Sequence, residues 1–172
     1  MIHPKCIVPE CNADTFFVEL VLNLPPKAPR HQHGKPNVLK YLDEVDLPKA
    51  VGIIDRDPGT LFQPTLSSYG YQLKPKEGSS EFLRFYEHEN KKYFLIEIDK
   101  KFEYWIYHKV IKEAPIVPSD YGIPNDWKGF YGYFKTKEIR TKGRVRQFFT
   151  ALIDSTSPSL QTYISWIEEC TR

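Results

Sequence analysis

Three acidic residues follow two apolar segments of this sequence, and their types and spacing suit the binding of a metal ion. Glu10 comes directly after apolar residues 6–9, and Asp55 and Asp57 come after apolar residues 50–54. If both segments are parallel strands, their carboxyl ends meet at one edge of a sheet, where ligands bind in such folds. Carboxylate oxygens suit Mg²⁺ or Mn²⁺ better than zinc. The pattern predicts a metal site made by Glu10, Asp55 and Asp57.

The elements around these acids read as alternating strands and helices. Asn12 is a good N-cap for an apolar helix over residues 13–24, and two prolines at 25 and 26 end that helix. A second helix over 36–44 begins with Pro36, which suits a first helical turn. The continuous apolar run 50–54 is typical of a strand that is covered on both faces in a parallel sheet.

The remainder of the chain predicts further elements in the same order. We expect a loop over 60–80, a hairpin of strands 81–88 and 92–98, a helix over 101–112, and an irregular stretch over 114–134. Two helices close the chain, over 141–153 and from Pro158 to about residue 169, with Ser157 as the N-cap of the second. We therefore predict an α/β fold, with a mostly parallel sheet, helices on both of its faces and a C-terminal helical pair.

Composition favours one folded unit. The chain has 172 residues, of which 41% are hydrophobic and 15% aromatic, enough to bury one core but not two. We expect residues 1–140 to form the α/β domain and 141–172 a helical pair packed on it. Cys6, Cys11 and Cys170 form no paired-cysteine motif, and we found neither a secretory leader nor a membrane span in the sequence. These features predict a cytoplasmic protein without disulfides.

Positive charge is concentrated near the C-terminal third. Between residues 128 and 146 the chain carries seven cations and one anion, whereas the net charge of the whole chain is +2. Such a stripe suits nucleic-acid phosphates, although a solvated loop and helix face is the simpler explanation of this signal taken alone. The candidate nucleic-acid ligands are Lys35, which opens a predicted helix, and four residues of the stripe: Arg140, Lys142, Arg144 and Arg146.

The acidic pattern resembles the Toprim domain of primases, topoisomerases and nucleases of the overcoming-lysogenization-defect type. In that family a glutamate follows the first strand and an Asp-x-Asp pair follows a later one, and Glu10 and Asp55-Arg56-Asp57 match these positions. Residues 33–38 (HGKPNV) and 98–106 (IDKKFEYWI) are also similar to small stand-alone Toprim-like proteins. The order and spacing of these short motifs supply most of the resemblance.

The resemblance implies a fold and a chemistry. It implies a Toprim-like layered sheet, Mg²⁺ or Mn²⁺ held by Asp55 and Asp57, and Glu10 either sharing the metal or acting as a general acid or base in phosphoryl transfer. The implied activity is that of a nuclease on DNA or RNA. Because Cys11 stands where family members commonly have glycine, a catalytically inactive Toprim-like protein that works with a partner ATPase is the alternative.

Other residues are weaker candidates for the same chemistry. Asp14 suits the first turn of its helix and is a secondary member of the acidic group, and Glu103 suits a helix start. His31 and His33 lack a third soft ligand nearby and read as loop residues. A third functional class, a phosphotransfer or nucleotide-binding domain of another lineage, ranks last because the chain has no phosphate-binding loop motif.

Overall fold

A computed structural model describes residues 4–57, 63–136 and 138–172 of the chain. Its centre is a five-stranded sheet in the order β1-β2-β5-β4-β3. The strands are β1 (Ile7–Pro9), β2 (Ala50–Arg56), β3 (Tyr71–Lys74), β4 (Leu83–His88) and β5 (Tyr93–Asp99). Parallel pairing joins β1 to β2 and β2 to β5, and antiparallel pairing joins β5 to β4 and β4 to β3. Only β4 therefore runs against the other four strands, and the α/β class and mostly parallel sheet are confirmed.

The outer edge of β1 is covered by a short extended segment. The backbone N–H of Arg30 donates to the carbonyl of Ile7 at 2.8 Å, and that of Gln32 donates to the carbonyl of Pro9 at 2.9 Å. Both partners advance by two residues, which is the pattern of parallel pairing. This segment gives two carbonyl groups at the edge of the sheet a hydrogen-bond partner, and it places residues 30–32 beside Glu10.

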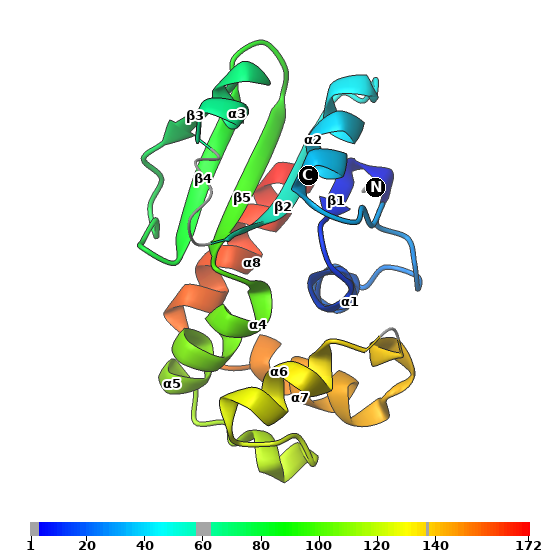
Figure 1. Ribbon diagram of the computed structural model, residues 1–172, viewed down its shortest axis with the longest axis vertical. Coiled ribbons are helices and arrows are strands. Elements are labelled where there is room, and N and C mark those ends of the chain that lie inside the picture. The colour runs from blue at the N-terminus through cyan, green and yellow to red at the C-terminus, as the bar shows by residue number, and fades with distance from the viewer. Residues whose placement is uncertain (1–3, 58–62, 137) are drawn as a thin grey trace.

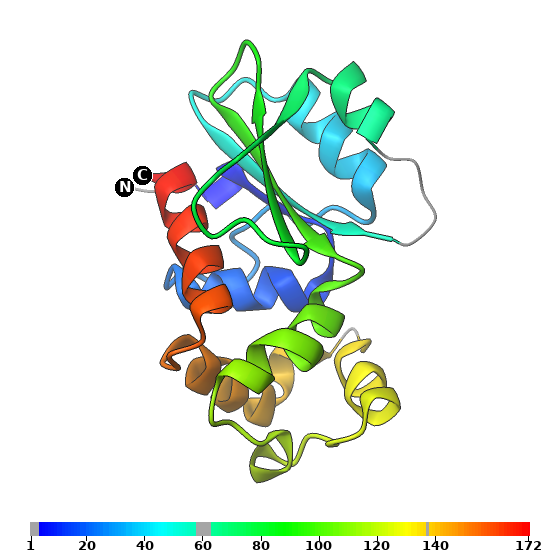
Figure 2. The same ribbon diagram turned by 90° about the vertical axis from the view of Figure 1, so that its left-hand side faces the viewer.

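Helices cover both faces of the sheet, as predicted (Figure 2). On one face lie α2 (Lys35–Glu44) and α3 (Gln63–Ser68), and on the other lie α1 (Asn12–Val21) and α8 (Pro158–Thr171). In the middle of the sheet, Gly52 lets α2 and β5 approach closely, because a Cβ there would lie 2.6 Å from a methyl carbon of Leu95 and 2.9 Å from methyl carbons of Leu42 and Val38.

The remaining helices form a layer beyond the carboxyl ends of β1, β2 and β5 (Figure 1). The predicted helix 101–112 is present as α4 (Phe102–Trp105), a π-helical turn η2 (Ile106–Val110) and α5 (Ile111–Glu113). Short turns η1 (Pro4–Cys6), η3 (Pro118–Tyr121) and η4 (Ile139–Thr141) and the helices α6 (Trp127–Phe134) and α7 (Gly143–Ile153) complete the chain. This layer therefore closes over the strand ends where the candidate acids lie.

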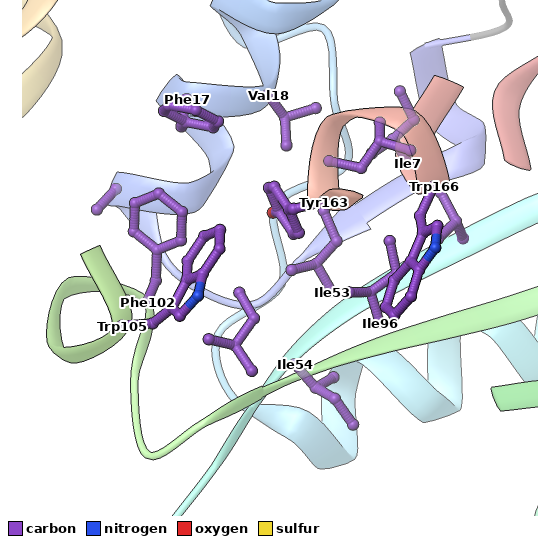
Figure 3. Close-up of a cluster of buried hydrophobic side chains, with 14 of the residues drawn as sticks. Ile7, Phe17, Val18, Ile53, Ile54, Ile96, Phe102, Trp105, Tyr163 and Trp166 are labelled. Atoms are coloured by element: carbon purple, nitrogen blue, oxygen red, sulfur yellow. The ribbon is translucent and has the colours of Figure 1, made fainter. Parts of the chain in front are cut away.

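Aromatic side chains join the sheet to this helical layer (Figure 3). Tyr163 of α8 lies at the centre of the cluster, with its ring centroid 5.1 Å from that of Trp105 and 6.2 Å from that of Phe17. The ring of Phe17 in turn lies 5.5 Å from that of Phe102. These four side chains are fully buried, so the helix that follows β5 is fixed firmly against α1 and α8.

Two predicted irregular stretches contain regular structure. Within 60–80, which we expected to be a loop, the described part includes α3 and β3; residues 58–62 lie outside the described residues. Two of the four side chains of strand β3 are exposed, and the strand is stabilised by antiparallel pairing with β4, which no local pattern reveals. Within 114–134, α6 forms because Asp126 accepts a hydrogen bond from the backbone N–H of Gly129 at 2.9 Å and caps it, despite two glycines inside the helix.

The helix boundaries differ from the predictions by a few residues, and one cap is different. The N-cap position of α1 is Cys11 rather than Asn12, and the carboxylate of Asp14 accepts from the Cys11 backbone N–H. Ser157 caps α8 as predicted, through a hydrogen bond from the Leu160 backbone N–H. The three cysteines are free. Within the described ranges, no helix has the length and apolar character needed to cross a membrane.

Candidate functional site

Glu10 lies at the end of β1 and contacts the end of β2. Its backbone N–H donates to the carbonyl of Ile53 at 3.0 Å, which extends the parallel ladder by one bond. Its carboxylate accepts a hydrogen bond from the backbone N–H of Asp55 at 2.8 Å. The N-terminal acid and the later Asp-x-Asp pair, 45 positions apart, therefore meet at one edge of the sheet.

Asp55 is buried beneath the start of the helix that follows β5. Its side chain accepts a hydrogen bond from the backbone N–H of Phe102 at 3.0 Å. Burial raises the pKa of Asp55 well above its usual value, and the nearby acids Asp14, Glu10 and Glu103 raise it further. A charged Asp55 is thus destabilised both by loss of water and by like charges.

Asp14 and Glu103 complete a group of four that we call the acidic cluster: Glu10, Asp14, Asp55 and Glu103. Asp14 is fully buried, and Glu103 is 8% exposed. Burial is the main cause of a raised pKa in both carboxyls, and Glu10 and Glu103 add to the effect on Asp14. The carboxylate of Asp14 caps α1, and it also belongs to the cluster because the charges of Glu10 and Glu103 act on it. Neighbouring acids with raised pKa values are common at functional sites, which makes the acidic cluster the candidate site.

Asp57 extends from the acidic cluster toward the solvent and is paired with a lysine. Its side chain is 46% exposed and lies 3.0 Å from the ammonium of Lys35, whose own side chain is only 6% exposed. Burial raises the pKa of Glu10, whereas the Asp55 backbone and the positive charge of Lys35 partly oppose this rise. The ammonium of Lys35 therefore provides positive charge to both Glu10 and Asp57.

A second lysine lies on the side of the helical layer. Lys101 precedes α4 and donates to the hydroxyl of Tyr131 in α6 at 2.9 Å. The pKa of Lys101 is raised, first by this hydrogen bond and further by the negative charges of Asp57 and Glu103. Positive charge thus reaches the acidic cluster from α2 and from the start of α4.

Another ion pair at the strand ends, between Arg56 and Asp99, has no net charge. The guanidinium of Arg56 forms an ion pair with Asp99, and its Nε donates to the same carboxylate at 3.0 Å. The Arg56 guanidinium also donates to the carbonyl of Glu81 at 3.1 Å. Asp99 is therefore compensated within the sheet and is not available to the acidic cluster.

The oxygen donors fit a hard divalent ion in type, although they do not yet enclose one. In the ranges 4–57, 63–136 and 138–172, no group of three or more Asp, Glu, His or Cys side chains is arranged to hold a metal ion. Glu10 and Asp55 use carboxylate oxygens to accept backbone N–H groups, and Asp57 is paired with Lys35. The side chains of Glu10, Asp55 and Asp57 therefore already have partners inside the chain.

The predicted nucleic-acid ligands lie in different surroundings. Lys35 is buried in the ion pair described above. Arg140 donates from Nε and from a terminal nitrogen to the two carboxylate oxygens of Glu19, at 3.1 and 2.8 Å. The ammonium of Lys142 donates to the carbonyl of Tyr133 at 3.2 Å and lies 4.1 Å from the centroid of that ring. These three cations therefore have partners inside the chain.

Arg144 and Arg146 are the exposed residues among the predicted nucleic-acid ligands. They are two residues apart in α7, which separates their directions by about 200° around a helix. The guanidinium of Arg146 lies 5.3 Å from the centroid of the Phe16 ring, and a Cβ on Gly122 would lie 2.5 Å from a guanidinium nitrogen of Arg144. The stripe is not one continuous face, and its member Lys137 lies outside the described residues.

The sequence patterns placed Asp14 and Glu103 only among the weaker candidates, although both belong to the acidic cluster. Asp14 lies four residues after Glu10, and that spacing places an acid on the first helical turn above the strand end. Glu103 lies four residues after the end of β5, on the first turn of α4. An acid on the first turn after a parallel strand is a usable signal, because such a turn lies at the carboxyl edge of the sheet.

Known proteins provide no further guide to this site. Comparison of the chain with protein-family models, with curated proteins and with solved structures gave no match. The residues and the geometry of the acidic cluster therefore carry the functional argument alone.

Proposed function

We propose that this chain catalyses Mg²⁺- or Mn²⁺-dependent cleavage of phosphodiester bonds in DNA or RNA, with chemistry of the Toprim type. The observation that carries the proposal is the acidic cluster at the carboxyl ends of β1, β2 and β5. The Toprim resemblance supports it, because Glu10, Asp55 and Asp57 occupy the positions where that family has its acids.

The acidic cluster is costly for a protein that has only to fold. Each buried carboxylate loses hydration, and each raises the free energy of its charged neighbours. Asp14 and Asp55, whose pKa values are raised well above the usual range, bear most of this cost. A divalent cation would offset it, so the arrangement favours cation binding over a purely structural role.

The residues divide into two roles under this proposal. Asp57, whose side chain is 46% exposed, and Asp55 would hold the ion, which when bound would neutralise charge on a phosphodiester and lower the pKa of water. Glu10 would share the ion or transfer a proton. Because its pKa is raised toward the working pH by burial, it is better suited to proton transfer than an exposed glutamate.

The test is cleavage of labelled single-stranded and double-stranded DNA and RNA in Mg²⁺, in Mn²⁺ and in EDTA. Asp57→Asn removes one charge at a half-exposed side chain and should reduce the metal-dependent rate at least about 100-fold. Asp120→Asn is the matched control, because Asp120 is exposed and lies outside the acidic cluster. Absence of cleavage, or equal rates in these two variants, would refute the proposal.

One observation favours a second candidate, a catalytically inactive Toprim-like protein that binds or regulates a partner ATPase. The buried Lys35 ammonium already supplies positive charge to Asp57 and Glu10, so the cluster is partly neutralised without a metal. Calorimetric titration with Mn²⁺ separates the candidates, because the inactive protein should bind none. Robust cleavage by the purified chain alone would exclude this alternative.

A further inference from the structure

A basic pocket lies on the side of β1 opposite to β2. Its volume is about 380 Å³, and it is formed by three segments that are far apart in sequence. Lys5 comes from the residues before β1, residues 27–31 from the connection between α1 and α2, and Arg140 from η4. No acidic side chain is among its lining residues: Lys5, Lys27, Ala28, Pro29, Arg30, His31 and Arg140.

A buried carboxylate, that of Glu19, contacts this lining from behind. Glu19 of α1 is 4% exposed and binds the Arg140 guanidinium through two hydrogen bonds. It also accepts the backbone N–H of Lys27 at 2.6 Å. Glu19 thus neutralises one of the four cations, and Lys5, Lys27 and Arg30 leave a local charge of about +3.

The lining is held in a defined conformation. Lys27 has a backbone φ of 63°, a left-handed value that costs a lysine roughly 1 kcal/mol. The hydrogen bond from its N–H to Glu19 holds this conformation, and the N–H of Arg30 is held by β1. Two cationic side chains are therefore attached to backbone positions that are fixed before any ligand arrives, which lowers the entropic cost of binding.

His31 connects the basic pocket to the acidic cluster. Its Nε2 is buried and has no hydrogen-bond partner among the described residues. The ring also forms a hydrogen bond with the Glu10 backbone. Buried polar atoms usually have a hydrogen-bond partner, and a ligand oxygen in the basic pocket would supply one to Nε2 when that nitrogen carries a proton.

We propose that this basic pocket binds inorganic phosphate or a terminal phosphate monoester, such as a nucleoside monophosphate or the 5′-phosphate of a nucleic-acid strand. A dianionic phosphate matches the charge left by Lys5, Lys27 and Arg30, and arginine binds phosphate oxygens through paired N–H groups. The proposal does not depend on catalysis at the acidic cluster, because it requires neither a metal ion nor bond cleavage.

Calorimetric titration in EDTA tests the basic pocket separately from the proposed nuclease. The probes are inorganic phosphate, thymidine monophosphate, and one short oligonucleotide prepared with either a 5′-phosphate or a 5′-hydroxyl. We expect one bound phosphate group per chain. Arg30→Gln and Lys27→Gln should each weaken its affinity about fivefold to twentyfold, because each removes one charged contact. Lys112→Gln removes an exposed cation elsewhere and should leave the affinity unchanged.

The probes identify the source of the phosphate. If the 5′-phosphorylated oligonucleotide binds more tightly than the 5′-hydroxyl form and the small phosphates, the ligand is the end of a strand. If inorganic phosphate, thymidine monophosphate and the 5′-phosphorylated oligonucleotide bind equally well, the ligand is a small phosphate. Absence of binding, or the same affinity in Arg30→Gln as in Lys112→Gln, would overturn the proposal. Loss of cleavage with retained phosphate binding would refute the nuclease and leave this inference intact.

Discussion

Replacing Asp55 with asparagine should make the metal-free protein more stable at neutral pH. Asparagine has nearly the same shape, and its side-chain oxygen can still accept the hydrogen bond from the Phe102 backbone N–H. The substitution removes a carboxyl whose pKa is raised well above the usual value by burial and by the charges of Asp14, Glu10 and Glu103. The variant would therefore lose a residue of the proposed site and gain free energy of unfolding.

The size of the gain follows from the surroundings of Asp55. With an effective dielectric constant of about 20, a like charge roughly 6–12 Å away contributes on the order of 1–3 kcal/mol. The lysines at the acidic cluster and partial protonation of its carboxyls reduce the sum, so we expect a net gain of about 1–2 kcal/mol. For a chain of 172 residues this corresponds to a rise in Tm of roughly 2–8 °C.

The pH dependence gives this prediction its sign. A carboxyl whose pKa is raised in the folded state binds more protons there than in the unfolded chain, so stability falls as pH rises above the ordinary value of 3.8. The advantage of Asp55→Asn should therefore be small near pH 4 and largest near pH 8. Urea denaturation in EDTA at both pH values, with Asp120→Asn as the control, measures it. A variant less stable than the parent at pH 8 would show that the carboxylate is a structural acceptor, and our reasoning would be wrong.

Three further variants test other parts of the structure. Gly52→Ala should cost about 1–3 kcal/mol in thermal denaturation, because the new Cβ would lie 2.6 Å from a leucine methyl carbon, whereas Gly132→Ala meets nothing within 4 Å and should be neutral or stabilising. Glu113→Gln should cost about 1–3 kcal/mol near pH 7. Burial raises the pKa of Glu113, but hydrogen bonds from lysine and serine side chains lower it overall to about 2, so this loss should shrink as pH falls from 4.5 toward 2. Lys35→Met should cost about 1–3 kcal/mol in EDTA because its carboxylate partner loses its counterion, and Mg²⁺ should restore more stability to this variant than to the parent if the site binds metal.

The parts of the fold that local signals determine were predictable. The helix over α8 followed from Ser157 and Pro158, and the buried strand β2 followed from a continuous apolar run with β-branched residues. Strand β3 was not predictable, because two of its four side chains are exposed and its pairing partner β4 lies about ten residues further along the chain. Tertiary pairing, rather than propensity, decides the structure of such a segment.

The site was predictable where a strand end fixed the position of a residue. Glu10 follows β1 directly and Asp55 lies near the end of β2, which runs parallel to β1, so the sheet itself brings them together. Arg140 was misleading for the opposite reason: its charge is visible in the sequence, but its partner Glu19 lies 121 positions away. A count of like charges along the chain cannot find the buried acid that neutralises one of them.

Lys35 shows most clearly how burial changes the meaning of a residue. In the sequence it is a cation at a helix start, which suits a phosphate. In the folded chain its ammonium lies 3.0 Å from Asp57, on a side chain that is 6% exposed. An incoming phosphate would have to compete with that carboxylate, whereas a divalent cation bound by Asp57 would release the ammonium. Under the proposed function, Lys35 would contact a phosphate only after a metal ion has bound to Asp57, so that proposal predicts cooperative binding of metal and phosphate at the acidic cluster.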